Sequence, residues 1–142
     1  DLTERQFRNI FKKASNIKGD TSQILIELLE RRLDATVYRM KFVPTIFSAR
    51  QLVNHGHVKV NGKRVNIPSY SVSDGDEISI RDKSKEINLI VESVSSQERE
   101  IPEYLEVDVK ELKGRFLRAP LIHDVPYPVT MEPNLVIEYY SR

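Results

Sequence analysis

The fold is decided by residues 31–70, RRLDATVYRMKFVPTIFSARQLVNHGHVKVNGKRVNIPSY, whose pattern predicts two helices followed by a β-hairpin. This segment carries eight lysine and arginine residues and one acidic residue, so its net charge is +7, against +1 for the whole chain. From residue 71 onward, nine basic residues are outnumbered by fifteen acidic ones. Because a local positive potential attracts polyanions even on a nearly neutral molecule, residues 31–70 are the candidate binding surface.

The hairpin is the strongest local signal in the sequence. Asn61 and Gly62 separate two runs of alternating apolar and polar residues, which predicts a type I′ turn. Successive side chains of a strand point to opposite faces, so the hairpin presents a cationic tip. The tip consists of Lys59, Lys63 and Arg64, and His55 and His57 lie at its edge.

The helix before the hairpin has a polar outer face. Pro44 ends the preceding helix, Thr45 caps the new one, and Gly56 is the expected end. The outward residues are Phe47, Arg50, Gln51 and Asn54. An exposed aromatic ring beside charge and amide groups is what looped or single-stranded RNA favours. The alternative is that Phe47 packs under a neighbouring loop.

Residues 21–42 show one apolar stripe of helical spacing, which predicts either a single helix or two helices with a break near residues 30–31. Glu27 and Arg31 are spaced as a helix ion pair. Arg32 and Arg39, seven residues apart, share a face and have no acidic residue four positions away, so both remain candidate RNA contacts.

The other elements are read from shorter patterns. Residues 3–18 predict a first helix whose outer face carries Arg5, Arg8 and Lys12. Residues 77–81, 104–107 and 115–118 predict strands, and residues 87–94 predict a helix. Four prolines make residues 119–133 an extended connection, while residues 134–142 are compatible with either a strand or a helix.

Several classes of chemistry are not indicated. The sequence has no cysteine, its three histidines form no metal pattern, and it contains neither a phosphate-binding glycine loop nor a nucleophile elbow. Its apolar runs fall short of the roughly 20 residues of a membrane span. We therefore expect no enzyme activity, cofactor, metal, small-molecule substrate or membrane partner.

Four short motifs resemble the α-L RNA-binding module: RLD (32–34), ARQLV (49–53), GHV (56–58) and VNG (60–62). LTERQF (2–7), NIPSY (66–70) and VIEYYSR (136–142) resemble the bacterial or organellar family of small-ribosomal-subunit protein four, and DVPYP (124–128) resembles its proteobacterial branch. The resemblance implies an α+β fold. In it an α-L module of helices on a small, mainly antiparallel sheet, residues 31–113, is inserted into a helical lobe made from residues 1–30 and 114–142. Residues 134–142 would then be helical.

The resemblance also implies a function. Members of the family are structural, primary rRNA-binding proteins that nucleate small-subunit assembly at a multi-helix junction. It further implies a position near the path by which mRNA enters, contacts with ribosomal protein five that affect decoding fidelity, and location in the cytoplasmic ribosome of a bacterium, with an organellar ribosome as the alternative. Two departures stand out. Ile46 and Phe47 occupy positions where many relatives have arginine. The family's amino-terminal extension, which in some members binds zinc, does not precede the first helix of this sequence.

The expected RNA contacts fall into two groups. Phosphate contacts are expected from Arg5, Arg8, Lys12, Arg32, Arg39, Arg50, Lys59, Lys63 and Arg64. Sugar, base or backbone contacts are expected from Gln51, Asn54, His55, His57, Asn61 and Tyr70. Two other functions compete with this one: an RNA-modifying enzyme that uses an α-L module, and a heat-shock-type α-L RNA-binding protein. The enzyme needs a separate catalytic domain, for which the residues after 113 are too few.

Overall fold

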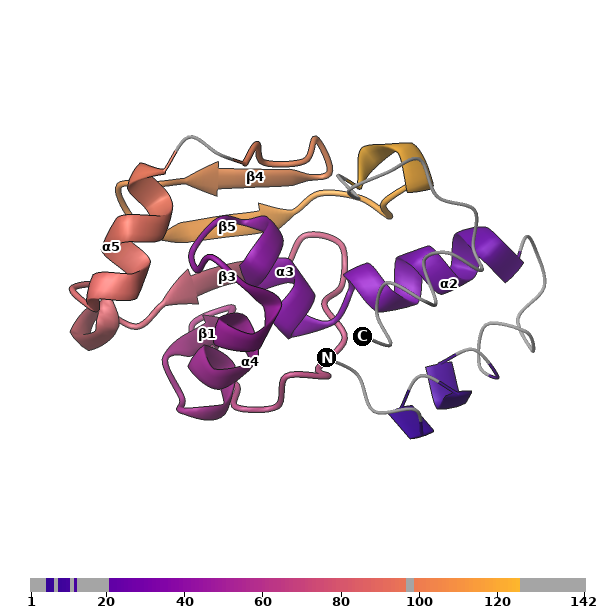
Figure 1. The fold of residues 1–142 in the computed structure, drawn as a ribbon, viewed down its shortest axis with the longest axis horizontal. Coiled ribbons are helices and arrows are strands. Elements are labelled where there is room, and N and C mark those ends of the chain that lie inside the picture. Colours follow the sequence, from indigo (N-terminus) through magenta and orange to yellow (C-terminus); the bar gives the residue numbers. More distant parts are fainter. Residues whose placement is uncertain (1–4, 7, 11, 13–20, 97–98, 126–142) are drawn as a thin grey trace. The chain divides into compact units, whose positions relative to one another are not determined.

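The structure is a computed structural model that describes residues 5–6, 8–10, 12, 21–96 and 99–125 (Figure 1). The chain divides into two compact units. The terminal unit comprises Asp1–Glu30 and Pro120–Arg142, and the central unit comprises Arg31–Ala119. The predicted binding segment, residues 31–70, thus lies within the central unit.

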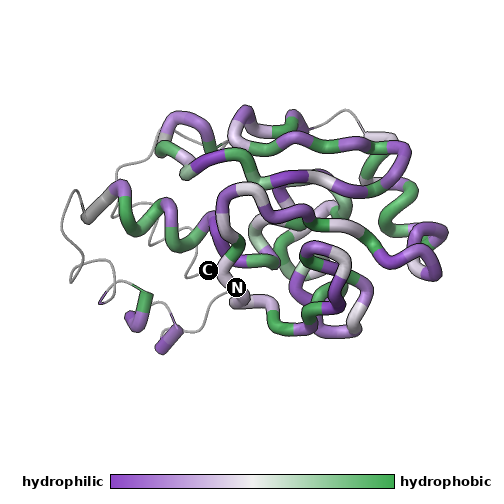
Figure 2. The backbone as a smooth tube through the Cα atoms, turned by 180° about the vertical axis from the view of Figure 1, so that it is seen from behind, coloured by the Kyte–Doolittle hydropathy of each residue, from purple (hydrophilic) through white to green (hydrophobic). Residues whose placement is uncertain are grey.

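A five-stranded sheet forms the base of the central unit. In chain order its strands are β1 (Val58–Val60), β2 (Lys63–Arg64), β3 (Glu77–Ile80), β4 (Leu105–Asp108) and β5 (Lys113–Phe116). Their spatial order is β2-β1-β3-β5-β4, and every neighbouring pair is antiparallel. Hydrophobic and hydrophilic residues alternate along the strands (Figure 2), as expected when one face is buried. The α+β fold with an antiparallel sheet is confirmed.

Helices α3 (Leu33–Arg39) and α4 (Ile46–Asn54) lie over one face of this sheet (Figure 1). The sheet residues that point toward them, such as Val58 and Ile78, are completely buried. Close approach is possible because Gly114 has no side chain: a Cβ there would lie 2.8 Å from the sulfur of Met40. The core of the central unit therefore sits between the sheet and these two helices.

The stripe of residues 21–42 is broken, which confirms the alternative of two helices. α2 (Thr21–Glu30) ends before Arg32, whose backbone is extended, and α3 then begins. The first two amide groups of α3, on Leu33 and Asp34, donate to the carbonyls of Tyr70 and Pro68 at 2.8 and 3.0 Å. The turn at residues 67–70 thus supplies the acceptors that a helix start requires.

The predicted α4 and hairpin are both confirmed. Thr45 and Ser48 form a capping box at the start of α4, and Gly56 follows its end with φ +78°. Val60 pairs with Lys63 across the two-residue turn. Asn61 and Gly62 both have positive φ, at 50° and 83°, which a type I′ turn requires.

The second half of the central unit also follows the prediction. The helix expected at residues 87–94 is α5 (Asn88–Ser95), and a short 3₁₀ helix, η1 (Asp82–Ser84), precedes it. β5 begins at Lys113 and pairs with both β3 and β4, so it carries the sheet past the expected domain boundary at residue 113. The central unit accordingly extends to Ala119.

The terminal unit is described in part. Residues 5–6, 8–10 and 12 are helical, as predicted for the first helix, whose two ends lie outside the described residues. Gln23 of α2 donates to the carbonyl of Pro120 at 2.6 Å, and η2 (Ile122–Asp124) follows. Residues 126–142 lie outside the described part, so a helical lobe formed by both chain ends stays a prediction. None of the described helices is long and apolar enough to cross a membrane.

Candidate nucleic-acid interface

The outer face of α4 is the first part of the candidate interface. Phe47, Gln51 and Asn54 are all exposed, and their spacing places them on one face of the helix. The side chain of Phe47 is 57% exposed, so the alternative that it packs under a loop is wrong. α4 therefore presents an aromatic ring and two side-chain amides to solvent.

Asp34 holds the arginines behind this face. Its carboxylate is 1% exposed and accepts from Arg32 through two bonds of 3.1 Å, and the Nε of Arg50 lies 3.4 Å away. The amide of Ala35 also donates to it, at 2.7 Å. Arg50 remains partly exposed, so its guanidinium is oriented by Asp34 and still reaches the surface of α4.

Arg32 and Arg39 are buried, which argues against direct phosphate contacts from either. Arg32 is 7% exposed and paired with Asp34. The guanidinium of Arg39 lies 5.2 Å from the centre of the Tyr38 ring. Burial of a paired arginine usually serves packing and helix orientation. We therefore assign both residues to the core of the central unit and leave them out of the proposed interface.

Arg31 has structural partners as well. Its guanidinium donates to Asp74 at 2.7 Å and to the carbonyl of Val72 at 2.9 Å, and it lies 4.8 Å above the Phe116 ring. These contacts tie the residue that follows α2 to the strand region of the central unit. Arg31 is thus not a free cation for RNA.

The hairpin tip is the second part of the interface. Lys63 and Arg64 are exposed, and Lys59 is half-buried beside Arg64 in the β1–β2 register. The Nε of Arg64 donates to the carbonyl of Gly56 at 3.1 Å, so the hairpin is anchored at the end of α4. This contact places the cationic tip next to the end of α4, where His55 is exposed.

Asn61 and Tyr70 both make hydrogen bonds within the central unit. The Asn61 amide donates to Asp76 at 2.9 Å, and its oxygen accepts from the Glu77 amide, also at 2.9 Å. These bonds tie the hairpin turn to the start of β3. Tyr70 lies on the turn that caps α3, and its ring is exposed enough to contact a ligand. Of the two, only Tyr70 is available for the predicted RNA contact without breaking internal bonds.

A substitution at Gly56 tests the contact by which Arg64 anchors the hairpin at the end of α4. A Cβ at residue 56 would lie 2.3 Å from a terminal nitrogen of Arg64, and the φ of +78° disfavours any other residue. We expect Gly56→Ala to lower the free energy of unfolding by about 1–2 kcal/mol and to displace Arg64. Urea unfolding measures the first effect. Gly62→Ala is the control, because its φ is also positive but its Cβ would meet no neighbour within 4 Å. Equal loss in both variants would show that the Arg64 contact contributes nothing.

His57 borders the tip in a more enclosed site. Its Nδ1 lies 2.6 Å from the hydroxyl of the buried Ser84. Burial lowers the pKa of His57, and the positive charges of Arg81, His55 and Arg64 lower it further. Sequence reasoning missed Arg81, although the alternation of β3 was a usable signal, since residue 81 falls on the same strand face as Ser79. The backbone amide of Arg81 donates to the carbonyl of His57 at 2.9 Å.

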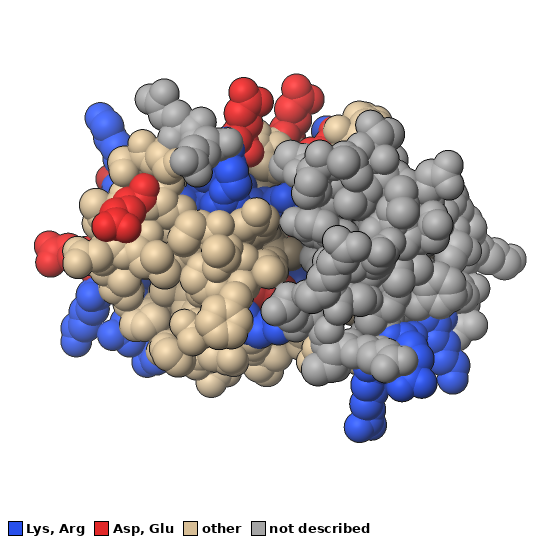
Figure 3. Space-filling view, viewed as in Figure 1, with Lys and Arg blue, Asp and Glu red and all other residues tan. Residues whose placement is uncertain are grey.

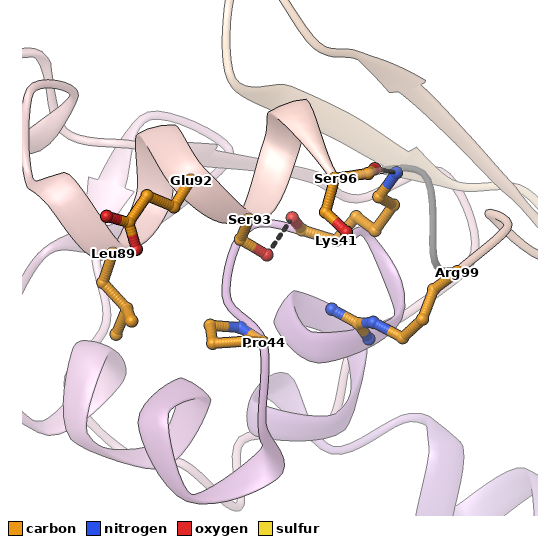
Figure 4. A pocket seen from close by; sticks show the side chains of 7 residues that line it. All are labelled: Lys41, Pro44, Leu89, Glu92, Ser93, Ser96 and Arg99. Atoms are coloured by element: carbon orange, nitrogen blue, oxygen red, sulfur yellow. Dashed lines mark hydrogen bonds between the residues drawn. The ribbon is translucent and has the colours of Figure 1, made fainter.

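A cavity of about 190 Å³ lies between α5 and the loop after α3 (Figure 4). Ser93 donates to the carbonyl of Lys41 at 2.8 Å, and the Lys41 ammonium donates to the carbonyl of Ser96. Arg99 donates to the carbonyls of Tyr38 and Val43 at 2.9 and 2.5 Å. These groups hold the loop in which Lys41 adopts a φ of 71°. The cavity is therefore a structural junction, and it offers no nucleophile–base pair among its lining residues.

Charge is distributed unevenly over the central unit. Acidic side chains project near β4 at the upper edge of the view in Figure 3, and β4 contains the exposed Glu106 and Asp108. The hairpin strand β2 at the other edge of the sheet consists of Lys63 and Arg64. The β2 edge therefore favours phosphates more than the β4 edge does.

Arg5, Arg8 and Lys12 are exposed and helical in the terminal unit. Their part in the same interface stays a prediction. Among the described residues, no group of histidine, cysteine and carboxylate side chains could hold a metal ion. A helix with stacking and amide groups, joined to a cationic hairpin, defines the central unit as a nucleic-acid-binding module.

Comparison with known proteins agrees with this class. Residues 31–78 match the family model of the S4 domain. The whole chain is 62% identical to small ribosomal subunit protein uS4 of Ruegeria sp. (strain TM1040), 61% identical to that of Ruegeria pomeroyi and 60% identical to that of Paracoccus denitrificans. Each alignment covers all 142 residues of this chain and 69% of the relative. The chain belongs to the uS4 family of small ribosomal subunit proteins.

Proposed function

We propose that the chain is a structural, non-enzymatic component of the small ribosomal subunit that binds rRNA through the central unit. The observation that carries this proposal is the continuous α4–hairpin interface in a member of the uS4 family. Its exposed cations suit phosphates, and its ring and amides suit unstacked bases. These two kinds of contact together give affinity and choice of site.

The residues of the α4–hairpin interface would make different kinds of contact with the RNA. Lys63, Arg64 and Arg50 would bind phosphates, since all three reach the surface. Gln51 and Asn54 would hydrogen-bond to sugars or base edges. Phe47 would stack on a base, which replaces the electrostatic contact that arginine makes in many relatives. At the start of α4 the chain would thus bind RNA more by stacking and less by charge than those relatives do.

We also propose a place for the chain within the small subunit. The chain would nucleate assembly at a multi-helix junction of the small-subunit rRNA, contact ribosomal protein five, and lie near the mRNA path in a bacterial cytoplasmic ribosome. The unequal charge of the sheet edges supports two partners of different kinds. Glu106 and Asp108 near β4 suit a basic protein surface, whereas the β2 edge suits RNA.

The test uses small-subunit rRNA of Ruegeria pomeroyi and chemical footprinting. We expect the chain to protect one helical junction. Phe47→Ala should weaken binding by about 1–3 kcal/mol, roughly five- to 150-fold, because a stacked base loses its platform. Its stability should barely change, since the ring is exposed.

Val91→Ala is the matched control, because Val91 is an apolar residue of α5 with 50% exposure and no proposed RNA contact. Protection spread evenly over the rRNA would contradict the proposed junction. Equal affinities for Phe47→Ala and Val91→Ala would contradict the stacking role.

A further inference from the structure

Arg81, which follows β3, is the one buried side-chain donor without an acceptor among the described residues. Its Nε is fully buried and has no hydrogen-bond partner within the described part of the chain. A buried donor of this kind is unfavourable, which makes Arg81 a candidate for binding an acceptor from outside the chain. The position is therefore unusual for an arginine with a purely structural role.

The surroundings of Arg81 are cationic. His57 precedes β1 and Arg81 follows β3, and the 2.9 Å backbone bond joins them. The positive charge of Arg81 lowers the pKa of His57. Arg64 and His55 act on the same ring from β2 and from the end of α4. The closest carboxylate in sequence, Asp82, is exposed and binds Lys85 at 3.0 Å. Residues in or next to four elements, β1, β2, β3 and α4, thus converge on one small region of positive potential.

We propose that Arg81, His57 and Arg64 bind one backbone phosphate of the RNA at this corner of the sheet. The proposal rests on the rRNA-binding function above and adds a phosphate site that reaches past the hairpin to the end of β3. The phosphate oxygens would accept from the Arg81 guanidinium and from the ring nitrogen of His57 that faces away from Ser84. Ser84 fixes the orientation of the ring through the Nδ1 contact of 2.6 Å.

A proton should accompany the phosphate. In the free chain, burial first, and then the electrostatic effect of Arg81, His55 and Arg64, lower the pKa of His57 and favour its neutral form. A bound phosphate adds negative charge and favours the imidazolium form, so its pKa rises on binding. RNA affinity should therefore increase as the pH falls through the window between the two pKa values, by up to about tenfold per pH unit. The free-state value lies below 6.5, which places this window around and below neutral pH.

The first experiment measures affinity for Ruegeria pomeroyi small-subunit rRNA against salt concentration. We expect Arg81→Gln to weaken binding roughly tenfold and to reduce the slope of log K against log salt by about 0.7–0.9. Arg81→Lys keeps the charge and should keep the slope. Arg115→Gln is the control, because Arg115 projects from the same sheet face but pairs with Glu77 at 3.7 Å.

The outcomes separate the two proposals. If the natural chain shows no salt-dependent binding to the rRNA, the proposed function fails. If the natural chain binds and folded Arg81→Gln matches Arg115→Gln in affinity and slope, the phosphate site is overturned while the function stands. If Arg81→Gln proves unfolded by circular dichroism, Arg81→Lys decides the matter, since a reduced slope with the charge retained would contradict the site.

The second experiment compares pH 7.5 with pH 5.5. We expect the natural chain to gain affinity at the lower pH relative to His57→Gln, and calorimetry in two buffers of different ionisation enthalpy should show proton uptake. His55→Gln is the control for the neighbouring ring, which lies 6.3 Å away. An unchanged pH dependence in His57→Gln would assign the proton to another group.

Discussion

Asp34→Ala is expected to lower the free energy of unfolding by about 3–5 kcal/mol. The carboxylate is buried, and its removal leaves the buried guanidinium of Arg32 without its counter-ion. It also removes the acceptor of the Ala35 amide and one partner of Arg50. Urea unfolding at neutral pH gives the loss directly.

The control for this variant is Asp74→Ala. Asp74 also pairs with an arginine, Arg31, at 2.7 Å, but its side chain is 58% exposed. An exposed ion pair contributes about 1 kcal/mol or less. A similar loss in both variants would show that burial does not govern the Asp34 contribution.

A double variant of the hairpin tip, Lys63→Ala with Arg64→Ala, is expected to show the largest change in RNA binding. Each side chain is exposed, and each would release about 0.7–0.9 counterions per phosphate contact. The slope of log K against log salt should therefore fall by about 1.5. Affinity near physiological salt should drop about 100-fold or more, since charged hydrogen bonds contribute about 1.5 kcal/mol or more each. Filter binding across a salt series measures both quantities.

Lys110→Ala with Lys113→Ala removes the same charge from the β4–β5 side of the sheet. Both lysines are exposed, and Lys113 lies opposite Asp108 in the strand register. We expect little change in the salt slope of this variant. Equal slopes in the two double variants would mean that net charge, rather than the position of the hairpin tip, governs binding.

Local patterns were enough to predict the elements of the interface. Asn61-Gly62 predicts its turn because few residues adopt two successive positive φ values. Thr45 and Gly56 bound α4 because their effects act within one helical turn. The strands followed from alternation, although β5 starts two residues before the predicted segment.

The interaction partners of the polar and charged side chains could not be predicted from local patterns. In a helix the partners of Arg32 would lie four positions away. Arg32 is extended instead, so Asp34 two positions later can reach it. Asn61 engages Asp76 and Glu77, which are distant in sequence. Arg81 lies in the acidic second half of the chain and was not among the predicted RNA contacts.

The sequence by itself determined the module, its helix caps, its hairpin and its family, because these depend on local conformation and on recurring motifs. Only the tertiary structure decided which charges are available. Whether an arginine is buried with Asp34, anchored on Gly56 or left without an acceptor as at residue 81 depends on which strands and helices pack together. A charge is available to RNA only where packing leaves its side chain at the surface, as at Lys63 and Arg64, and not where the side chain is buried, as at Arg32.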